Sequence, residues 1–277
     1  MNAFRHRRDC ETGETVTAIQ TVGLFHTEVK EVYIPNEEVK DEFRNAVEER
    51  GSNMLKGVIF DMDGVIINSE PQHYEAYVMF CKDYGVEFPY DEYKGFIGST
   101  HAKLCQYIKE NFEIPVSEDK MQEKLREYRE YLIETKGYEE IAGMKELIKD
   151  LHKNGIKLAI ASSSPEREII RVAETLGIDS YFTKLVSGET VEHPKPAPDV
   201  FLKAVNELGL SVEECIIIED SENGVRAAKA AGVPVIGFYN PDSGDQDLSK
   251  AHIVVEGFEE VDFDFVEKVY QRAYSIP

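Results

Sequence analysis

The sequence has few cysteines, no long apolar run and little positive charge. Its four cysteines are scattered, with no Cys-x-x-Cys pair, which is typical of reduced thiols and not of a disulfide framework or a zinc site. No apolar run approaches the roughly 18 residues that a membrane span needs. The basic stretch Met1–Arg8 is not followed by an apolar segment, so it is not a secretory signal. These absences favour a cytoplasmic protein without a membrane partner.

The shortage of positive charge also argues against nucleic acid and anionic membranes as partners. Lysine and arginine number 31 against 53 acidic residues, and the net charge is −22 at pH 7. Such a chain offers no general surface for nucleic acid or for anionic membranes. An anionic small molecule would need a metal ion or a few well-placed cations. The length of 277 residues is enough for one large α/β domain and a small one.

One apolar run ends in a pair of carboxylates. Val58-Ile59-Phe60 stops at Asp61 and Asp63, and Gly64 follows. A short apolar run between turn residues is typical of a buried parallel strand, and open α/β sheets bind ligands beyond the carboxyl ends of such strands. Two neighbouring carboxylates repel each other unless a cation or a proton lies between them. A strand end with a simple Asx-turn is the alternative interpretation.

Strand and helix patterns alternate from about residue 137 onwards, which predicts a mostly parallel sheet in an α/β fold. The expected strands are 58–60, 157–161, 184–187, 215–218, 233–238 and 253–255. The expected helices of this part are 144–153, one ending at 176, one ending near 208 and one over 227–231.

Residues 69–136 show helical patterns and no convincing strand. Ser69 can cap a helix that runs to about Tyr84, and further helices are expected at 101–112 and 118–135. We therefore expect a small helical domain over 69–136, inserted into a catalytic core of 54–68 and 137–277. We interpret residues 1–53 as a short N-terminal extension and an appended remnant, with a candidate strand at 29–34 and a candidate helix at 36–49.

Polar side chains follow two further strands and occupy one loop. Ser162 ends the strand 157–161, Glu219 and Asp220 follow 215–218, and Lys195 lies between two prolines. The carboxylate oxygens of Asp61, Glu219 and Asp220 suit Mg²⁺, whereas Ser162 at a helix start suits a phosphate oxygen. Lys195 adds positive charge without competing for the metal. Each residue alone has an ordinary explanation, such as a helix cap, a solvated loop lysine or a favourable helix dipole.

Taken together, this set resembles the motifs of the haloacid dehalogenase superfamily of phosphotransferases, and within it the β-phosphoglucomutase-like sugar-phosphate phosphatases. The resemblance covers about residues 54–277 and implies a Rossmann-like core with a helical cap inserted after the first motif. The matching segments are Asp61-Met62-Asp63-Gly64, Ser162, Lys195 in Lys-Pro-Ala-Pro-Asp, and Glu219-Asp220-Ser221-Glu222-Asn223-Gly224.

The resemblance also implies roles for single residues. Asp61 would be the nucleophile that forms an aspartyl-phosphate, and Asp63 the general acid and then base. Mg²⁺ is expected at Asp61, the main-chain carbonyl of Asp63, Asp220 and Glu219. Asn223 would orient a metal ligand or a water. Contacts to the phosphoryl group or the rest of the substrate are expected from Ser162, Lys195, Ser163, Gly64, Val65, His73, Ser99 and Thr100.

Other features concern the cap. Asn68 and Ser69 mark one hinge and residues 137–143 the other. His73 either couples cap closure to Asp63 or packs at the hinge. The stretch 94–101 has no arginine, whereas β-phosphoglucomutases carry one there for the distal phosphate, and this favours hydrolysis. Lys103, Lys124, Arg126 or Arg129 could substitute for it. Pro194 precedes Lys195 where relatives often have glycine or serine.

The sequence thus predicts a Mg²⁺-dependent phosphatase that acts on a small phosphorylated metabolite, in particular a sugar phosphate. A β-phosphoglucomutase is the nearest alternative. A noncatalytic binding or regulatory protein that kept the fold is a more remote one. Neither the substrate nor the oligomeric state follows from the sequence.

Overall fold

The computed structural model describes residues 6–8, 15–17, 54–97 and 101–275. The chain divides into two units, residues 1–52 and 53–277. In the first unit, β1 (His6–Arg8) pairs antiparallel with β2 (Thr15–Thr17). The strand expected at 29–34 and the helix expected at 36–49 lie outside the described residues, as do Ser99 and Thr100.

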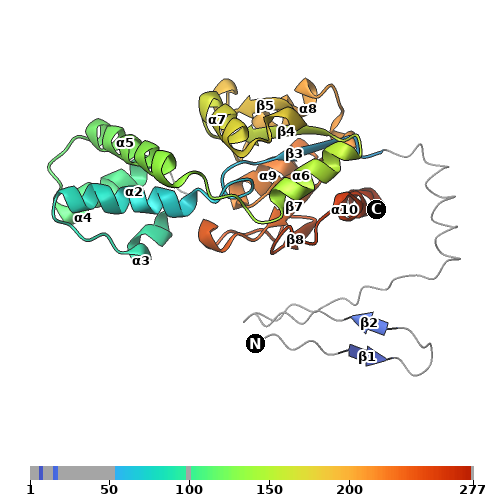
Figure 1. Cartoon of the computed structure of the whole chain (residues 1–277), viewed down its shortest axis with the longest axis horizontal. Coiled ribbons are helices and arrows are strands. Elements are labelled where there is room, and N and C mark those ends of the chain that lie inside the picture. Colours follow the sequence, from blue (N-terminus) through green and yellow to red (C-terminus); the bar gives the residue numbers. More distant parts are fainter. Residues whose placement is uncertain (1–5, 9–14, 18–53, 98–100, 276–277) are drawn as a thin grey trace, which may run out of the picture. The chain divides into compact units, whose positions relative to one another are not determined.

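The second unit is built on a six-stranded parallel sheet with the strand order β5-β4-β3-β6-β7-β8 (Figure 1). The chain enters at the central strand β3, adds β4 and β5 on one side, and then crosses over to add β6, β7 and β8 on the other. In open α/β sheets, this reversal opens a crevice beyond the carboxyl ends of the central strands. The strands are β3 (Gly57–Phe60), β4 (Lys157–Ser162), β5 (Phe182–Ser187), β6 (Cys215–Glu219), β7 (Val235–Phe238) and β8 (Ile253–Val255).

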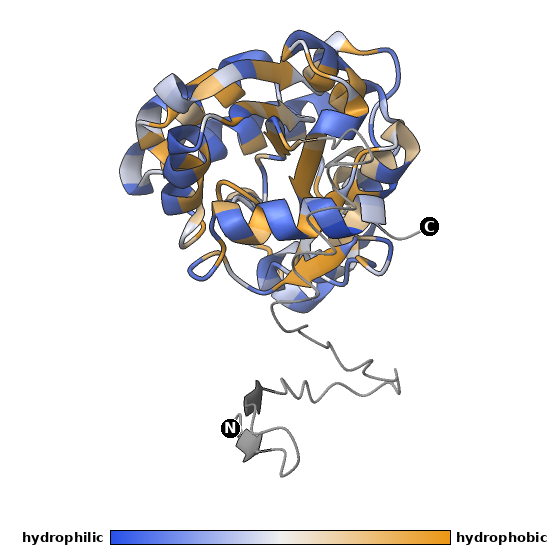
Figure 2. Cartoon of the chain, turned by 90° about the vertical axis from the view of Figure 1, so that its right-hand side faces the viewer, coloured by the Kyte–Doolittle hydropathy of each residue, from blue (hydrophilic) through white to orange (hydrophobic). Residues whose placement is uncertain are grey.

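Helices cover both faces of the sheet because successive strand residues point to opposite sides. Val58 and Phe60 of β3 belong to one hydrophobic cluster and Ile59 to another. The first cluster lies under α6 (Met144–Lys153), α7 (Glu166–Leu176) and α10 (Phe263–Ser275), and the second under α8 (Asp199–Glu207) and α9 (Glu222–Ala231). Figure 2 shows orange, apolar strands between helices that carry blue, polar turns.

Between β3 and β4 the chain forms a helical cap with its own apolar core. Tyr77, Phe80 and Leu132 are buried in this core. No strand occurs in the described residues of the segment 69–136, and Figure 1 shows the cap helices to one side of the sheet. The cap helices are α2 (Glu70–Asp83), α3 (Tyr90–Tyr93), α4 (His101–Phe112) and α5 (Glu118–Lys136).

The two connections between core and cap lie side by side. The N–H of Asn68 donates to the carbonyl of Glu139 at 2.8 Å, and Ile67 forms an antiparallel bridge with Glu140. These contacts lie at the two positions where the sequence predicts hinges.

None of the described helices has the length and apolar character that a membrane crossing requires. Short 3₁₀ turns complete the second unit. The turns are η1 (Lys94–Phe96), η2 (Asp179–Tyr181), η3 (Gly188–Thr190), η4 (Val212–Glu214) and η5 (Pro241–Ser243).

The predicted fold class is confirmed, with several local differences. The helices α3 and α10 were not predicted. The helix α9 begins at Glu222 and not at 227, because the Ser221 hydroxyl accepts the N–H of Gly224 at 3.0 Å and caps it earlier. Ser69 precedes α2 as expected, but its side chain makes no capping hydrogen bond, so that part of the prediction is wrong.

Candidate active site

A cavity of about 190 Å³ lies at the carboxyl edge of the sheet. Asp61 and Asp63 reach it from the end of β3, Ser162 and Ser163 from the end of β4, and the remaining groups from later loops and the cap. The predicted site residues that line it are Asp61, Asp63, Gly64, His73, Ser162, Ser163, Lys195, Glu219 and Asp220; the other lining residues are Ser69, Glu70, Ile97, Ser221, Ser243 and Gln246.

Lys195 ties two of the carboxylates together. Its ammonium group donates to Asp61 Oδ1 at 2.5 Å, to Glu219 Oε1 at 2.9 Å and to the carbonyl of Ala161 at 3.3 Å. The ammonium also lies 4.5 Å from the centre of the Phe201 ring. A lysine has three N–H donors, so all three are engaged. A phosphoryl oxygen that binds Lys195 must therefore replace one of these partners.

Negative charge exceeds positive charge in this buried cluster. Asp61, Glu219 and Asp220 are buried, and each places an oxygen within 4.8 Å of the others. Burial, reinforced by repulsion from Glu219 and Asp63, raises the pKa of Asp61 to about 7 although Lys195 attracts its charge. Burial and the neighbouring Glu219 and Asp61 also raise the pKa of Asp220. Burial lowers the pKa of Lys195, but the two carboxylates outweigh it and the pKa ends above its ordinary value.

These three residues fit a hard divalent cation. They offer carboxylate oxygens, the ligands that Mg²⁺ prefers. A cation among them would relieve the repulsion that, together with burial, raises the pKa values of Asp61 and Asp220. Glu219 Oε2 is held by the N–H of Ser221 at 2.6 Å and by its hydroxyl at 3.0 Å. The first motif approaches Asp220 closely at Gly64: a Cβ at this residue would lie 2.0 Å from Asp220 Oδ2, and its φ is +84°.

Asp63 lies in a different environment from Asp61. Its Oδ2 accepts the hydroxyl of Ser164 at 2.7 Å and, more weakly, that of Ser162 at 3.4 Å. The Ser162 hydroxyl accepts the N–H of Ser164 at 3.0 Å. The β4–α7 turn therefore holds Asp63, while Lys195 holds Asp61. Ser164 was not predicted; its only signal was the run of three serines at the strand end.

A model of the haloacid dehalogenase-like hydrolases matches residues 58–238 of the chain. The chain belongs to this family. It is 31% identical over 179 residues to a phosphorylated carbohydrates phosphatase of Thermotoga maritima, with 65% of this chain and 82% of that protein covered. It is 29% identical over 181 residues to fructose-1-phosphate phosphatase of Escherichia coli, with 65% and 94% covered.

The fold agrees with a solved member of the family. The crystal structure of a β-phosphoglucomutase from Clostridium difficile superposes with a TM-score of 0.65 at 26% sequence identity. The match covers 80% of this chain and 100% of that chain. The family assignment and the Rossmann-like fold predicted from the sequence are both confirmed.

The cap side of this haloacid dehalogenase-like site carries an acid, an imidazole and an apolar side chain. Glu70 accepts the hydroxyl of Tyr93 at 2.5 Å, and His73 Nδ1 lies 3.7 Å from Glu70 Oε2. Ile97 closes the apolar side. Four cations were predicted as alternatives to a phosphate-binding arginine. None of them, Lys103, Lys124, Arg126 or Arg129, lines the cavity.

Two predicted residues lie outside the cavity, one in the last motif and one directly after the first. Asn223 is exposed and does not line the cavity, because α9 turns it away from the carboxylates. Val65 is buried and does not line the cavity either. The residues that take part instead, Ser243 and Gln246, follow β7. Their signal was the turn sequence Asn240-Pro241-Asp242-Ser243-Gly244 after a strand whose carboxyl end lies at the same edge of the sheet.

Proposed function

We propose that this protein is a Mg²⁺-dependent phosphatase that hydrolyses a small phosphorylated metabolite, in the first place a sugar monophosphate. The observation that carries the proposal is the pair of carboxylates in the first motif: Asp61 beside Lys195 in a buried, cation-deficient cluster, and Asp63 apart from it on two serine hydroxyls. The names of the two relatives reported above support a phosphorylated carbohydrate as the substrate class.

Asp61 acts as the nucleophile in this proposal. Its carboxylate oxygen attacks phosphorus, the bond from phosphorus to the leaving oxygen breaks, and an aspartyl-phosphate remains. Lys195 orients Asp61 through its 2.5 Å hydrogen bond and attracts its negative charge. When bound at Asp61, Asp220 and Glu219, Mg²⁺ would supply the positive charge that favours ionised Asp61 and screens the incoming phosphoryl group.

Asp63 acts as the proton donor and then as the proton acceptor. It gives its proton to the leaving alkoxide, and it takes a proton from the water that attacks the aspartyl-phosphate, so the proton count is restored after one turnover. Its Oδ2 accepts hydrogen bonds from Ser162 and Ser164, whereas the ammonium group of Lys195 donates to Asp61. Ser162, Ser163 and Lys195 supply the donors for the phosphoryl oxygens.

Phosphate release from a panel of sugar monophosphates tests the proposal. We expect hydrolysis with Mg²⁺ and none after EDTA treatment, with activity restored by added Mg²⁺. Asp63→Asn should lose most activity through slow proton transfer while Mg²⁺ binding is kept. A protein that hydrolyses none of the panel, or that is indifferent to EDTA, would contradict the proposal. An Asp63→Asn variant that lost only Mg²⁺ affinity would contradict the role given to Asp63.

A β-phosphoglucomutase is the second candidate, because the solved mutase structure is matched over its whole length. A mutase must hold a bisphosphate in two orientations, which requires a cationic grip on the second phosphate. Within the described part of the cavity, Lys195 is the only lysine or arginine, and Asp61 and Glu219 already engage it. Conversion of β-glucose 1-phosphate to glucose 6-phosphate, primed by the bisphosphate, would favour the mutase if it outran phosphate release.

A further inference from the structure

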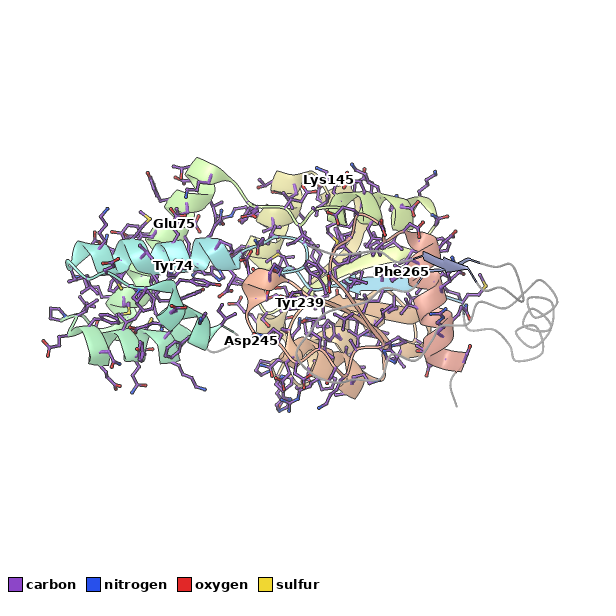
Figure 3. The ribbon with its side chains drawn as sticks, turned by 90° about the horizontal axis from the view of Figure 1, so that it is seen from below. Tyr74, Glu75, Lys145, Tyr239, Asp245 and Phe265 are labelled. Carbon is purple, nitrogen blue, oxygen red and sulfur yellow. The ribbon has the colours of Figure 1, made fainter. Side chains whose placement is uncertain are left out.

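The loop that follows β7 joins the cation-binding cluster to the cap. We call residues 239–246 the β7 loop. Its shape is set locally: Asn240 Oδ1 accepts the N–H of Asp242 at 2.9 Å, Pro241 begins the turn η5, and Gly244 has a φ of +71°. Asn240 and Ser243 are buried. Figure 3 shows the labelled Asp245, near the end of the loop, where the core borders the cap helices.

One contact of the β7 loop reaches the cluster itself. The Ser243 hydroxyl donates to Asp220 Oδ2 at 2.5 Å, and the pair is buried. The loop is fastened at this point by Gln246, whose Nε2 donates to the Ser243 carbonyl at 2.9 Å and whose Oε1 accepts the N–H of Glu222 at 3.0 Å. Ser243 thus occupies one oxygen of Asp220 and fixes the direction of the other.

A second set of contacts reaches both cap connections. Asn68 Nδ2, in the first connection, donates to Asp242 Oδ2 at 2.8 Å and to Glu139 Oε1, in the second, at 3.3 Å. Asn240 Nδ2 donates to the Gly64 carbonyl at 3.0 Å. These bonds join the hinge, the first motif and the β7 loop.

The β7 loop also touches the cap directly. A Cβ added to Gly244 would lie 3.2 Å from Cβ of Ile97, the cap residue that lines the cavity. The same short loop therefore meets the hinge, the cap wall and Asp220.

We propose that the β7 loop positions Asp220 for its cation and couples that position to the cap, with Ser243 and Asp242 as the positioning residues. Groups that hold a metal ligand by hydrogen bonds fix its orientation, and their loss typically weakens metal binding. Because Ser243 and Asp242 are neighbours in one turn, a shift of Asn68 on cap movement is passed to the Asp220 carboxylate. The inference rests on the cation site of the proposed function.

Calorimetric titration of Mg²⁺ in the absence of substrate tests the link to Asp220. We expect Ser243→Ala to bind Mg²⁺ about tenfold to a hundredfold more weakly than the wild-type protein, because Asp220 loses its fixed orientation. Gln246→Ala, which frees the loop without touching Asp220, should shift the affinity in the same direction. If Ser243→Ala does not fold, as judged by circular dichroism and thermal melting, Gln246→Ala decides the question.

The coupling to the cap needs a matched control. Asp242→Ala breaks the bond to Asn68 and should weaken Mg²⁺ binding about fivefold or more. The control is Glu130→Gln, which alters another contact between core and cap, the ion pair of Glu130 on α5 with Arg171 on α7. This pair is remote from the β7 loop in the chain, so the control should bind Mg²⁺ like the wild-type protein.

The outcomes separate this inference from the proposed function. A wild-type protein that binds no Mg²⁺ overturns the proposed function and this inference with it. If the wild-type protein binds Mg²⁺ and the affinity of Ser243→Ala lies within about twofold of the wild-type affinity, only the role of the loop is overturned. Gln246→Ala replaces Ser243→Ala in this comparison if Ser243→Ala does not fold. An equal loss in Asp242→Ala and Glu130→Gln shows that any loosening of the cap acts in this way, and overturns the coupling.

Discussion

Asp61 and Asp63 bear the same functional group only two residues apart, yet their surroundings differ. The turn after β3 begins at once, with the N–H of Ile66 donating to the Met62 carbonyl at 2.9 Å. As a result, Asp61 faces Lys195 and Asp63 faces the serines of the β4–α7 turn. Carboxylates in contrasting environments can take contrasting roles. This contrast supports the proposed division of roles, with Asp61 as nucleophile and Asp63 as acid and base.

Asp61→Asn should abolish turnover, with a loss of at least about a thousandfold, because an amide does not attack phosphorus. Phosphate release checks this after mass spectrometry has excluded deamidation. Wild-type-like activity of Asp61→Asn would contradict the role of Asp61 as the nucleophile.

The same substitution should change the pH dependence of stability in the metal-free protein. The pKa of Asp61 is raised from 3.8 to about 7 by folding, so the unfolded chain releases this proton first as pH rises. The wild-type protein should therefore lose stability relative to Asp61→Asn between about pH 4 and about pH 7. Unfolding free energies of both proteins in EDTA, across this range, test the prediction. A difference between them that stays constant with pH would contradict it.

Gly64→Ala should inactivate the protein for two separable reasons. A left-handed conformation costs a residue with a Cβ roughly 1–2 kcal/mol, and the new Cβ would also collide with Asp220 Oδ2. Gly85→Ala is the matched control, since Gly85 has a φ of +72° and nothing within 4 Å of the added Cβ. Both variants should lose similar backbone stability, but only Gly64→Ala should lose activity and Mg²⁺ affinity. Equal activities in the two variants would show that the close approach at Gly64 is unimportant.

Single site residues were predictable where a charged side chain occurs at a position in the chain that is typical of a ligand site. Asp61, Lys195 and Asp220 each stand out because charged groups follow buried strands or lie in a loop beside them. Ser164 and Ser243 were missed because a serine in a turn is ordinary. Their importance comes from which carboxylate they meet after folding, and a linear pattern does not contain that information.

At the scale of elements, the sheet was predictable because its strands are short apolar runs bounded by glycine or polar residues. The strand β6 and the helix α6 lie within one residue of their expected bounds. The helix α10 was not predicted, although its sequence carries a helical pattern. Val266, Val269 and Tyr270 are buried at helical spacing, and Asp262 Oδ1 accepts the N–H of Phe265 at 2.8 Å at its start.

The cap elements predict the kind of leaving group. Glu70, His73 and Ile97 form the described cap side of the cavity, and a second phosphate would meet the Glu70 carboxylate there. A good charge-assisted contact is worth roughly 1.5–3 kcal/mol, or about tenfold to a hundredfold in kcat/KM, and the described cap wall supplies none through lysine or arginine. We expect monophosphates to be hydrolysed at least as well as matched bisphosphates. Measurements of kcat/KM on one set of hexose phosphates test this. A preference for bisphosphates above about tenfold would indicate a binding site for a second phosphate.

At the scale of the whole molecule, the motif set is complete after Met54. Contacts also divide the chain into residues 1–52 and 53–277. A chain that begins at Met54 should therefore fold and keep a kcat/KM similar to that of the 277-residue chain, since every proposed catalytic group lies in the second unit. Side-by-side kinetics of the two chains provide the measurement. Insolubility or inactivity of the shorter chain would place residues 1–53 within the folding unit or the oligomer.

The closeness of the two cap connections has a thermodynamic consequence for the core. The N–H of Asn68 donates to the carbonyl of Glu139 at 2.8 Å. For the core, the whole insertion is therefore a loop whose two ends are held together. The entropy lost on closing such a loop grows only with the logarithm of its length, by about 0.6 kcal/mol for each doubling. The stability of the core therefore depends only weakly on the length of the insertion. Changes of substrate can be explored by rebuilding the cap, while the sheet and its carboxylates remain as they are.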